Sequence, residues 1–289
     1  MSVSMDLIKQ LREETGAGIS DCKNALIESQ GDIDKARKIL LAKGAAKAAK
    51  KLDRLTKEGV ISIKNDGKNA IMIELGCETD FVGRNEKFVE LAKNITEFLF
   101  DKDFSTIDEA LNLEYKDSKD LRTFINENIS VFGENIRLSR VKVLKAQKES
   151  EIIFDYLHFN NRVGVLVLID SEKELDEEIK KELGNKVVFQ IASMKPVYLD
   201  LSSIPNEEIE EQKRMAFEQA KSEGKPEHIA QKIAEGKVLK IFEESVLLEQ
   251  PFFDDSMKLP KFKDYIKFME SKIGGKIVVK DFARFEIGK

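Results

Sequence analysis

Residues whose types and spacing could support covalent chemistry are scarce in this sequence. Its two histidines and two cysteines do not cluster at the spacing of metal ligands: Cys22, Cys77, His158 and His228. The sequence contains neither Gly-x-Ser-x-Gly nor a phosphate-binding glycine-rich loop ending in Lys-Ser or Lys-Thr. Gly16-Ala17-Gly18 is similar to the start of a dinucleotide fingerprint, but Asp21 occupies the third glycine position and no strand is expected before it. We therefore expect a binding protein without catalytic groups, metal or cofactor.

The segment with the clearest functional pattern is Cys77-Glu78-Thr79-Asp80-Phe81-Val82. An apolar run from Ala70 to Leu75 precedes it and alternates like the end of a strand. Apolar residues at helical spacing follow it, from Phe88 to Leu99. Asp80 and Phe81 are therefore expected at a strand-to-helix corner, where a side chain can be rigid and still point outward.

Two interpretations of this corner are open. In the first, Asp80 caps the following helix and Phe81 packs back into the core. In the second, Phe81 is a wedge for a pocket on another protein, and Asp80 orients it. Because caps and buried phenylalanines are common, the residues alone favour the first interpretation.

The composition narrows the class of protein. Charged residues make up 35% and hydrophobic residues 42% of the 289 residues, which is typical of a soluble globular protein. The net charge of −5 argues against general affinity for nucleic acid or anionic membranes, and no apolar run is long enough to span a membrane. With two cysteines far apart, both thiols are expected to be free in a reducing compartment. We expect a cytoplasmic protein.

The elements that must position the corner begin with three short helices at the N-terminus. Gly16 is expected to end the first helix, Asp32 to cap the third and Gly44 to close it. The following segment, 45–55, is expected to be a solvated helical linker. A weaker alternative is a basic RNA patch without interleaved aromatic residues, formed by Lys47, Lys50, Lys51 and Arg54.

The middle of the chain contains what looks like a duplicated unit. In the first copy, strands Gly59–Lys64 and Ala70–Leu75 flank an Asp66-Gly67 turn, and a third strand runs from Leu138 to Leu144. Strands grouped with helices, rather than strictly alternating with them, predict an α+β fold with antiparallel sheets.

The second copy repeats the pattern with strands Ile152–Tyr156 and Val163–Ile169 around Asn160-Asn161, and with a third strand at Ile277–Phe285. We divide the chain into a helical bundle with linker at 1–55 and two related lobes at 56–147 and 148–289.

The second lobe carries an insertion at about 203–248 that predicts an antiparallel helical hairpin. One helix runs from Pro205 to Ser222, Gly224-Lys225-Pro226 reverses the chain, and Ile229–Phe242 carries an apolar stripe that includes Ile241. The apolar edge could be covered by a protein partner, by self-association or by its own lobe.

Taken together, these pieces resemble the bacterial elongation factor Ts family, the nucleotide-exchange factors for elongation factor Tu. The resemblance covers the chain from end to end and rests on segments in the family's order: Leu11-Arg12, Thr15-Gly16-Ala17-Gly18, Asp21-Cys22-Lys23, Ala25-Leu26, Gly31-Asp32, Gly44-Ala45, Lys47-Ala48-Ala49-Lys50, Thr79-Asp80-Phe81-Val82, Gly133-Glu134-Asn135-Ile136, Gly164-Val165-Leu166, Ser193-Met194-Lys195-Pro196, Gly224-Lys225-Pro226, Gln250-Pro251-Phe252 and Arg284-Phe285-Glu286.

The resemblance implies an N-terminal bundle similar to a UBA domain, two related α+β lobes and a helical hairpin. It also implies that elongation factor Tu is bound in its GDP-bound and nucleotide-free forms, through Thr79, Asp80, Phe81 and Val82. Asp80 and Phe81 would enter the GTPase domain of the partner and help to dislodge its magnesium ion, which reverses the preference between the two interpretations.

Further contacts are implied at the C-terminal lobe and at the N-terminal turn, through Thr15, Gly16, Ala17, Gly18, Ile19, Asp21 and Lys23. The turn has two glycines that allow close backbone approach. Some family members carry another helical module at the C-terminus, whereas this sequence stops at Lys289, so we expect the contact of that module to be absent or replaced. An RNA-associated scaffold is the competing hypothesis, and no residues support an enzyme.

Overall fold

A computed structural model describes residues 3–116 and 119–289 of the protein. The side chains of residues 45–49, 239 and 241 lie outside the description. They include Lys47 of the expected basic segment and Ile241 of the expected apolar stripe.

The chain begins with three helices, α1 (Met5–Thr15), α2 (Ile19–Glu28) and α3 (Ile33–Ala49). Gly16 ends α1 in the left-handed conformation, with φ of 65°, and Asp32 caps α3 by accepting the Lys35 N–H at 3.0 Å, as the sequence predicted. The helices share a small core: Ile8, Leu11, Cys22, Ala25, Leu26 and Ala36.

The expectation that Gly44 closes the third helix is wrong, because α3 continues through Gly44 to Ala49. A Cβ atom at Gly44 would lie 2.9 Å from the hydroxyl oxygen of Ser130, on helix α7 (Leu121–Phe132). The glycine therefore permits close packing of the two helices. The expectation of a helical linker is only partly correct, since the chain turns between residues 50 and 54.

Two antiparallel three-stranded sheets form the centre of the molecule, so the α+β prediction is confirmed. The first sheet has the order β1-β2-β3, with β1 at Glu58–Asn65, β2 at Asn69–Cys77 and β3 at Arg137–Lys145. The second has the order β4-β5-β6, made of Glu151–Leu157, Val163–Ser171 and Ile277–Glu286. In both sheets the register shifts at corresponding positions of the central strand, which supports the duplication.

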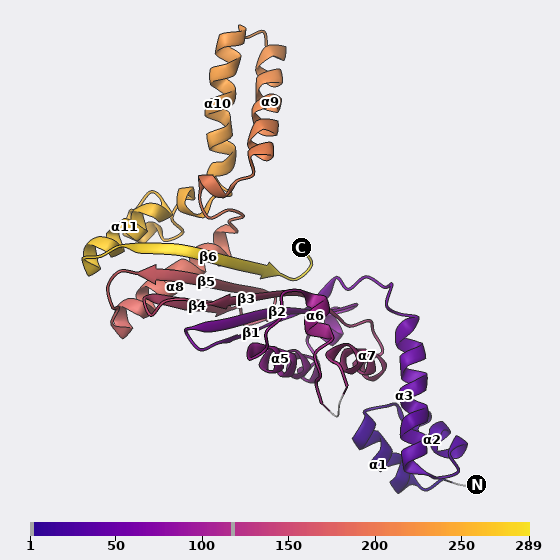
Figure 1. Ribbon diagram of the computed structural model, residues 1–289. Coiled ribbons are helices and arrows are strands. Elements are labelled where there is room, and N and C mark those ends of the chain that lie inside the picture. Colours follow the sequence, from indigo (N-terminus) through magenta and orange to yellow (C-terminus); the bar gives the residue numbers. More distant parts are fainter. Residues whose placement is uncertain (1–2, 117–118) are drawn as a thin grey trace.

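Helices cover the outer faces of the two sheets. In chain order they are α4 (Asp80–Gly83), α5 (Glu86–Phe100), α6 (Ile107–Leu111) and α7 beside the first sheet, and α8 (Glu177–Met194) and α11 (Phe262–Ile273) beside the second. Short 3-10 turns lie at Leu201–Ser203, Leu247–Glu249 and Asp255–Met257. Figure 1 shows α5 and α7 on the outer side of the first sheet.

The two sheets pack against each other through a separate core of Ile61, Ala70, Met72, Leu144, Ile153, Leu166, Leu168 and Ile287. Each hairpin turn also binds the first strand of the other copy. Ile61 donates its N–H to Asn161 O at 2.8 Å, and Ile153 donates to Gly67 O at 2.9 Å. The two copies are therefore held in one frame.

Helices α9 (Asn206–Ser222) and α10 (Glu227–Glu243) lie side by side and project from the second lobe (Figure 1). Small buried residues separate them: Ala216, Ala220, Ala230 and Ala234. Met215, Ile229 and Ile233 remain partly exposed, so the pair leaves an apolar edge uncovered. Self-association through this edge stays a prediction.

We expect Gly164→Ala to destabilise the contact between the sheets. Its Cβ would lie 2.6 Å from Ile61 Cγ2 and 2.8 Å from Met72 Sδ, an overpacking that costs about 1–3 kcal/mol. Urea unfolding measures the loss. The matched control is Gly236→Ala in α10, where the Cβ meets open space and should stabilise the helix by about 0.5–1 kcal/mol. Equal effects of the two substitutions would contradict this account.

Candidate protein–protein interface

The strand-to-helix corner presents Phe81 to solvent. Strand β2 ends at Cys77, Thr79 precedes the single turn of α4, and the Phe81 side chain is 84% exposed. The two residues that follow it are held by the lobe, since Val82 packs on the first lobe's core and Gly83 is buried. A Cβ at Gly83 would lie 3.3 Å from Gly59 O, so the turn sits closely on β1. The C-terminal residues of the corner therefore pack on the first lobe, while the Phe81 ring projects into solvent.

The interpretation that Asp80 is a cap and Phe81 a core residue is wrong. Asp80 is the first residue of α4 and pairs with Arg84 at 3.1 Å, while Asn85 caps α5 by accepting the Lys87 N–H at 2.9 Å. The Asp80–Arg84 pair is solvent-exposed and adds little stability. Neither residue of the Asp80-Phe81 pair is therefore explained by the stability of the corner.

A carboxylate from a distant part of the chain holds the corner. Gly133 ends α7 in the left-handed conformation, and the next residue, Glu134, turns toward the end of β2. Its carboxylate accepts the N–H groups of Glu78 at 3.0 Å and Thr79 at 2.9 Å, and the Thr79 hydroxyl at 2.5 Å. These two amides lie beyond the last paired residue of β2, so the sheet does not satisfy them.

Glu78 returns the interaction. Its carboxylate accepts the Asn135 N–H at 2.7 Å and also binds the Arg54 guanidinium at 3.3 Å. The Asn135 N–H lowers the pKa of Glu78, burial opposes this shift and Arg54 adds to it. The Asn135 side chain donates to Leu52 O at 3.2 Å and Arg54 O at 2.8 Å. The chain leaving the N-terminal helices is thus attached at the same place.

The cysteine in the corner is inert. Cys77 is buried, and its thiol donates to Thr79 O at 3.2 Å. Burial, with smaller contributions from the charges of Glu134 and Glu58, raises the pKa of Cys77 to about 12. The thiol is protonated at neutral pH and cannot act as a nucleophile. Within residues 3–116 and 119–289, no group of three or more His, Cys, Asp or Glu side chains could hold a metal ion.

The residues predicted to form the N-terminal contact lie in two different environments, a cleft and the solvent-exposed surface. Thr15 and Ala17 line a cleft of about 600 Å³ between the first helices and α7, and a Cβ at Gly16 would lie 3.3 Å from the methyl groups of Val131. Gly18 precedes α2, whose Ile19 is 51% exposed. Further along α2, Asp21 and Lys23 are exposed as well. The outward surface of the turn therefore consists mainly of Ile19 and the two charged residues.

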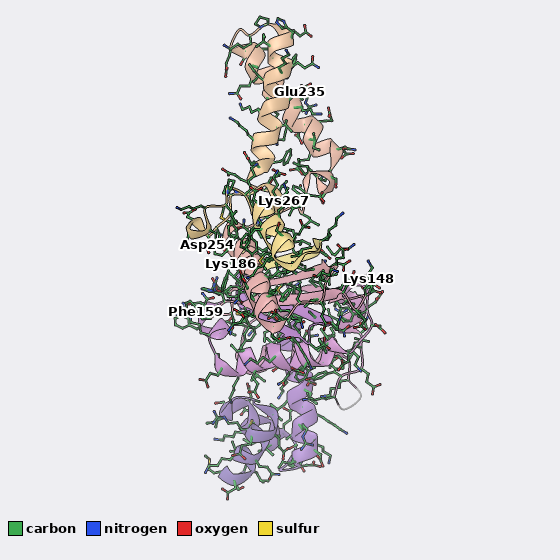
Figure 2. All side chains as sticks on the ribbon, turned by 90° about the vertical axis from the view of Figure 1, so that its left-hand side faces the viewer. Lys148, Phe159, Lys186, Glu235, Asp254 and Lys267 are labelled. Carbon is green, nitrogen blue, oxygen red and sulfur yellow. The ribbon has the colours of Figure 1, made fainter. Side chains whose placement is uncertain are left out.

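Sequence reasoning missed one exposed aromatic group, at the tip of the β4–β5 hairpin. Phe159 is 88% exposed and lies against the His158 ring, with centroids 4.4 Å apart, while the Tyr156 hydroxyl and His158 Nδ1 are 2.5 Å apart (Figure 2). Phe189 of α8 extends the cluster, 5.1 Å from Tyr156. The available signal was an aromatic residue directly before the Asn160-Asn161 turn, where no sheet core can cover it.

The structure brings this tip and the corner to the same end of the sheets. Arg162, just after the turn, pairs with Glu58, and Glu58 lies opposite Cys77 in the β1–β2 ladder. Phe81 and Phe159 are thus two exposed aromatic residues on segments at the same end of the central sheets.

No described helix is long and apolar enough to cross a membrane.

Comparisons with known proteins all indicate the same family. A family model described as "Elongation factor TS" matches residues 78–289. The chain is 45% identical to "Elongation factor Ts" of Aquifex aeolicus (strain VF5), an alignment that covers 100% of this chain and 99% of that protein. It is 41% identical to "Elongation factor Ts" of Hydrogenobaculum sp. (strain Y04AAS1), with 100% of both chains covered. The chain belongs to the elongation factor Ts family.

Proposed function

We propose that this protein is a translation elongation factor that accelerates GDP release from elongation factor Tu, without making or breaking covalent bonds. It would bind the GDP-bound partner and hold the nucleotide-free partner more tightly. Family membership supports the reaction, and the exposed Phe81 on a clamped corner supports the site. The exposed ring is the single observation that carries the assignment of the site.

The proposed mechanism is a coupling between two ligands of the same partner. Asp80 and Phe81 enter the GTPase domain and displace its magnesium ion, which leaves phosphate charge uncompensated and weakens nucleotide binding. By linkage, nucleotide and exchange factor must weaken each other's binding equally. Magnesium here belongs to the partner and its nucleotide.

Phe81 cannot supply the whole effect. An acceleration of about four decades requires the barrier to fall by about 5.5 kcal/mol. Burial of one phenyl ring contributes about 2–3 kcal/mol. Additional contacts must therefore bind at the same time, in a geometry fixed relative to the corner.

We assign these additional contacts to two surfaces. The first is the N-terminal turn, through Ile19 and its charged neighbours, with 1–55 acting as a docking unit. The second is the aromatic tip at Phe159 on the C-terminal lobe, 148–289. The Glu58–Arg162 pair supports joint action of the tip and the lobe 56–147, because it holds the tip beside the corner. The projecting pair α9–α10, about 203–248, would be available for a second copy.

The first prediction concerns the reaction. Release of a fluorescent GDP from elongation factor Tu should accelerate with increasing concentration of this protein and reach a plateau. The protein alone should hydrolyse no GTP, since its sequence contains no phosphate-binding glycine-rich loop ending in Lys-Ser or Lys-Thr. Unchanged release at saturating protein would contradict the proposed function.

The second prediction concerns the wedge. Phe81→Ala should lower the maximal release rate by about 30- to 160-fold, the equivalent of losing the ~2–3 kcal/mol of one buried phenyl group. Its Tm should stay close to that of the unchanged protein, because the ring touches little of its own core. Phe88→Ala is the matched control, since Phe88 is fully buried and its loss costs about 3–5 kcal/mol of stability. A large Tm loss with normal release for Phe81→Ala would exclude the wedge.

The third prediction concerns the N-terminal turn. Ile19→Ala should weaken binding to nucleotide-free elongation factor Tu about tenfold, because the exposed part of one isoleucine contributes about 1–2 kcal/mol when buried. Titration calorimetry measures the change. Ile27→Ala is the control, since Ile27 lies on the same helix, is 49% exposed and falls outside the turn. Equal losses for the two variants would argue against a contact specific to the turn.

A further inference from the structure

We propose that Glu134 is a positioning residue that sets the Asp80–Phe81 corner in its binding geometry before the partner arrives. This inference rests on the proposed function, and it adds a residue that contacts neither nucleotide nor magnesium in that mechanism.

The first step is that the corner contains too little helix to hold its own shape. Helix α4 has four residues, and its own backbone bonds are Gly83 N–H to Thr79 O at 3.2 Å and Arg84 N–H to Asp80 O at 3.0 Å. A single turn of helix is too short to be stable alone.

The second step is that Phe81 cannot fix its own position. With 84% of its surface exposed, the ring has few packing contacts on the corner. Val82 and Gly83 seat the C-terminal side of the turn, but the N-terminal side, where β2 has ended, needs a different restraint.

The third step is that Glu134 supplies this restraint. One carboxylate accepts three hydrogen bonds from the two residues that precede Asp80, namely Glu78 and Thr79. Charge-assisted bonds of this kind are shorter and stronger than bonds between neutral groups. A carboxylate accepts at both oxygens, so it suits a site with two N–H groups and a hydroxyl.

The fourth step is that Glu134 is itself held in place. Asn135 N–H binds the Glu78 carboxylate, so each segment is an acceptor for the other. On the other side, Lys51 donates to Gly133 O. Hydrogen bonds therefore connect the corner, the end of α7 and the chain after α3 to one another.

The consequence is pre-organisation. Without Glu134, residues 78–80 must become ordered during insertion into the partner, and that entropy cost appears in the step where the wedge acts. The contacts at Ile19 and Phe159 do not use Glu134, so initial binding should be nearly unaffected. Loss of Glu134 should thus lower the maximal release rate but leave the half-saturating concentration of this protein almost unchanged.

The experiment measures GDP release from elongation factor Tu over a concentration series of full-length variants. Glu134→Ala should lower the maximal rate about tenfold, with less than about twofold change in the half-saturating concentration, as expected when a segment must be ordered on insertion. Glu134→Gln should keep the maximal rate within about threefold of the unchanged protein. The glutamine amide oxygen can accept the N–H groups of Glu78 and Thr79, and its NH₂ can donate to the Thr79 hydroxyl oxygen.

Glu151→Ala is the matched control. The Glu151 carboxylate also accepts two backbone N–H groups, from Gln147 at 2.6 Å and Lys148 at 3.2 Å. It lies beside the turn at Lys68, the opposite end of the β1–β2 hairpin from Cys77. Figure 2 shows Lys148 and Phe159 on opposite sides of the sheets. Glu151→Ala should lower Tm but keep the maximal release rate.

A second variant pair distinguishes positioning from general damage. In the Phe81→Ala background, Glu134→Ala should cost much less than tenfold, because the ring is gone and only Asp80 is left to position. A tenfold loss that persists in that background overturns the proposal, and so does a folded Glu134→Ala protein with the wild-type maximal rate.

A measurement independent of exchange activity completes the test and remains valid if Glu134→Ala fails to fold. In the unchanged protein, hydrogen exchange at the Glu78 and Thr79 amides should be as slow as at the paired amides of β2. Rapid exchange at both amides overturns the proposal. If the unchanged protein does not accelerate GDP release at all, the proposed function fails instead, and the amide measurement still decides whether Glu134 holds the corner.

Discussion

Two backbone amides that the β2 ladder leaves without a partner impose the constraint on which the proposed interface depends. The Glu78 N–H is half-buried and would be costly without an acceptor, so the chain supplies one where the ladder stops; the exposed Thr79 N–H shares it. The acceptor is the Glu134 carboxylate, brought there because α7 ends at Gly133 in a left-handed turn. The return bond from Asn135 to Glu78 makes the arrangement reciprocal. The bonds that satisfy these amides also hold the segment that precedes the exposed Phe81.

The packing of the two sheets gives this local restraint a wider reach. Each hairpin turn accepts a backbone hydrogen bond from the first strand of the other copy, so the two sheets are tied together at both ends. The Arg140 guanidinium crosses between copies, binding Glu74 at 2.5 Å and Glu286 O at 2.8 Å. The segments that carry Phe81 and Phe159 therefore belong to one frame, as the proposed simultaneous contacts with one partner would require.

The helical pair α9–α10 does not pack on a sheet but projects from the second lobe. Alanines between the helices bring them close, while its only attachment to the lobe among the described residues is at the base (Figure 1). There the buried Gln250 side chain donates to Met194 O at 2.8 Å and Glu244 O at 2.7 Å, and Gln190 donates to Gln250. The arm is anchored at its base by these polar bonds and by a small apolar core of Ile204, Val238, Phe242 and Val246, and it exposes an apolar edge farther along its length.

The sequence by itself determined the strands, the two hairpin turns and the helix that contains Phe88, whereas α11 beside the second sheet was not predicted. These depend on alternation, on 3.6-residue spacing and on turn residues such as Asp66-Gly67, which act over a few positions. It also determined the family, through segments spread along the whole chain. The tertiary structure decided that Phe81 is exposed, that Gly44 lies within a helix, and that Phe159 stands beside the corner. Each of these depends on contacts between distant segments: Glu134 with Thr79, Gly44 with Ser130, and Arg162 with Glu58. Local patterns carry no information about which distant segment meets a residue, and that meeting decides whether a side chain is covered or left free to bind.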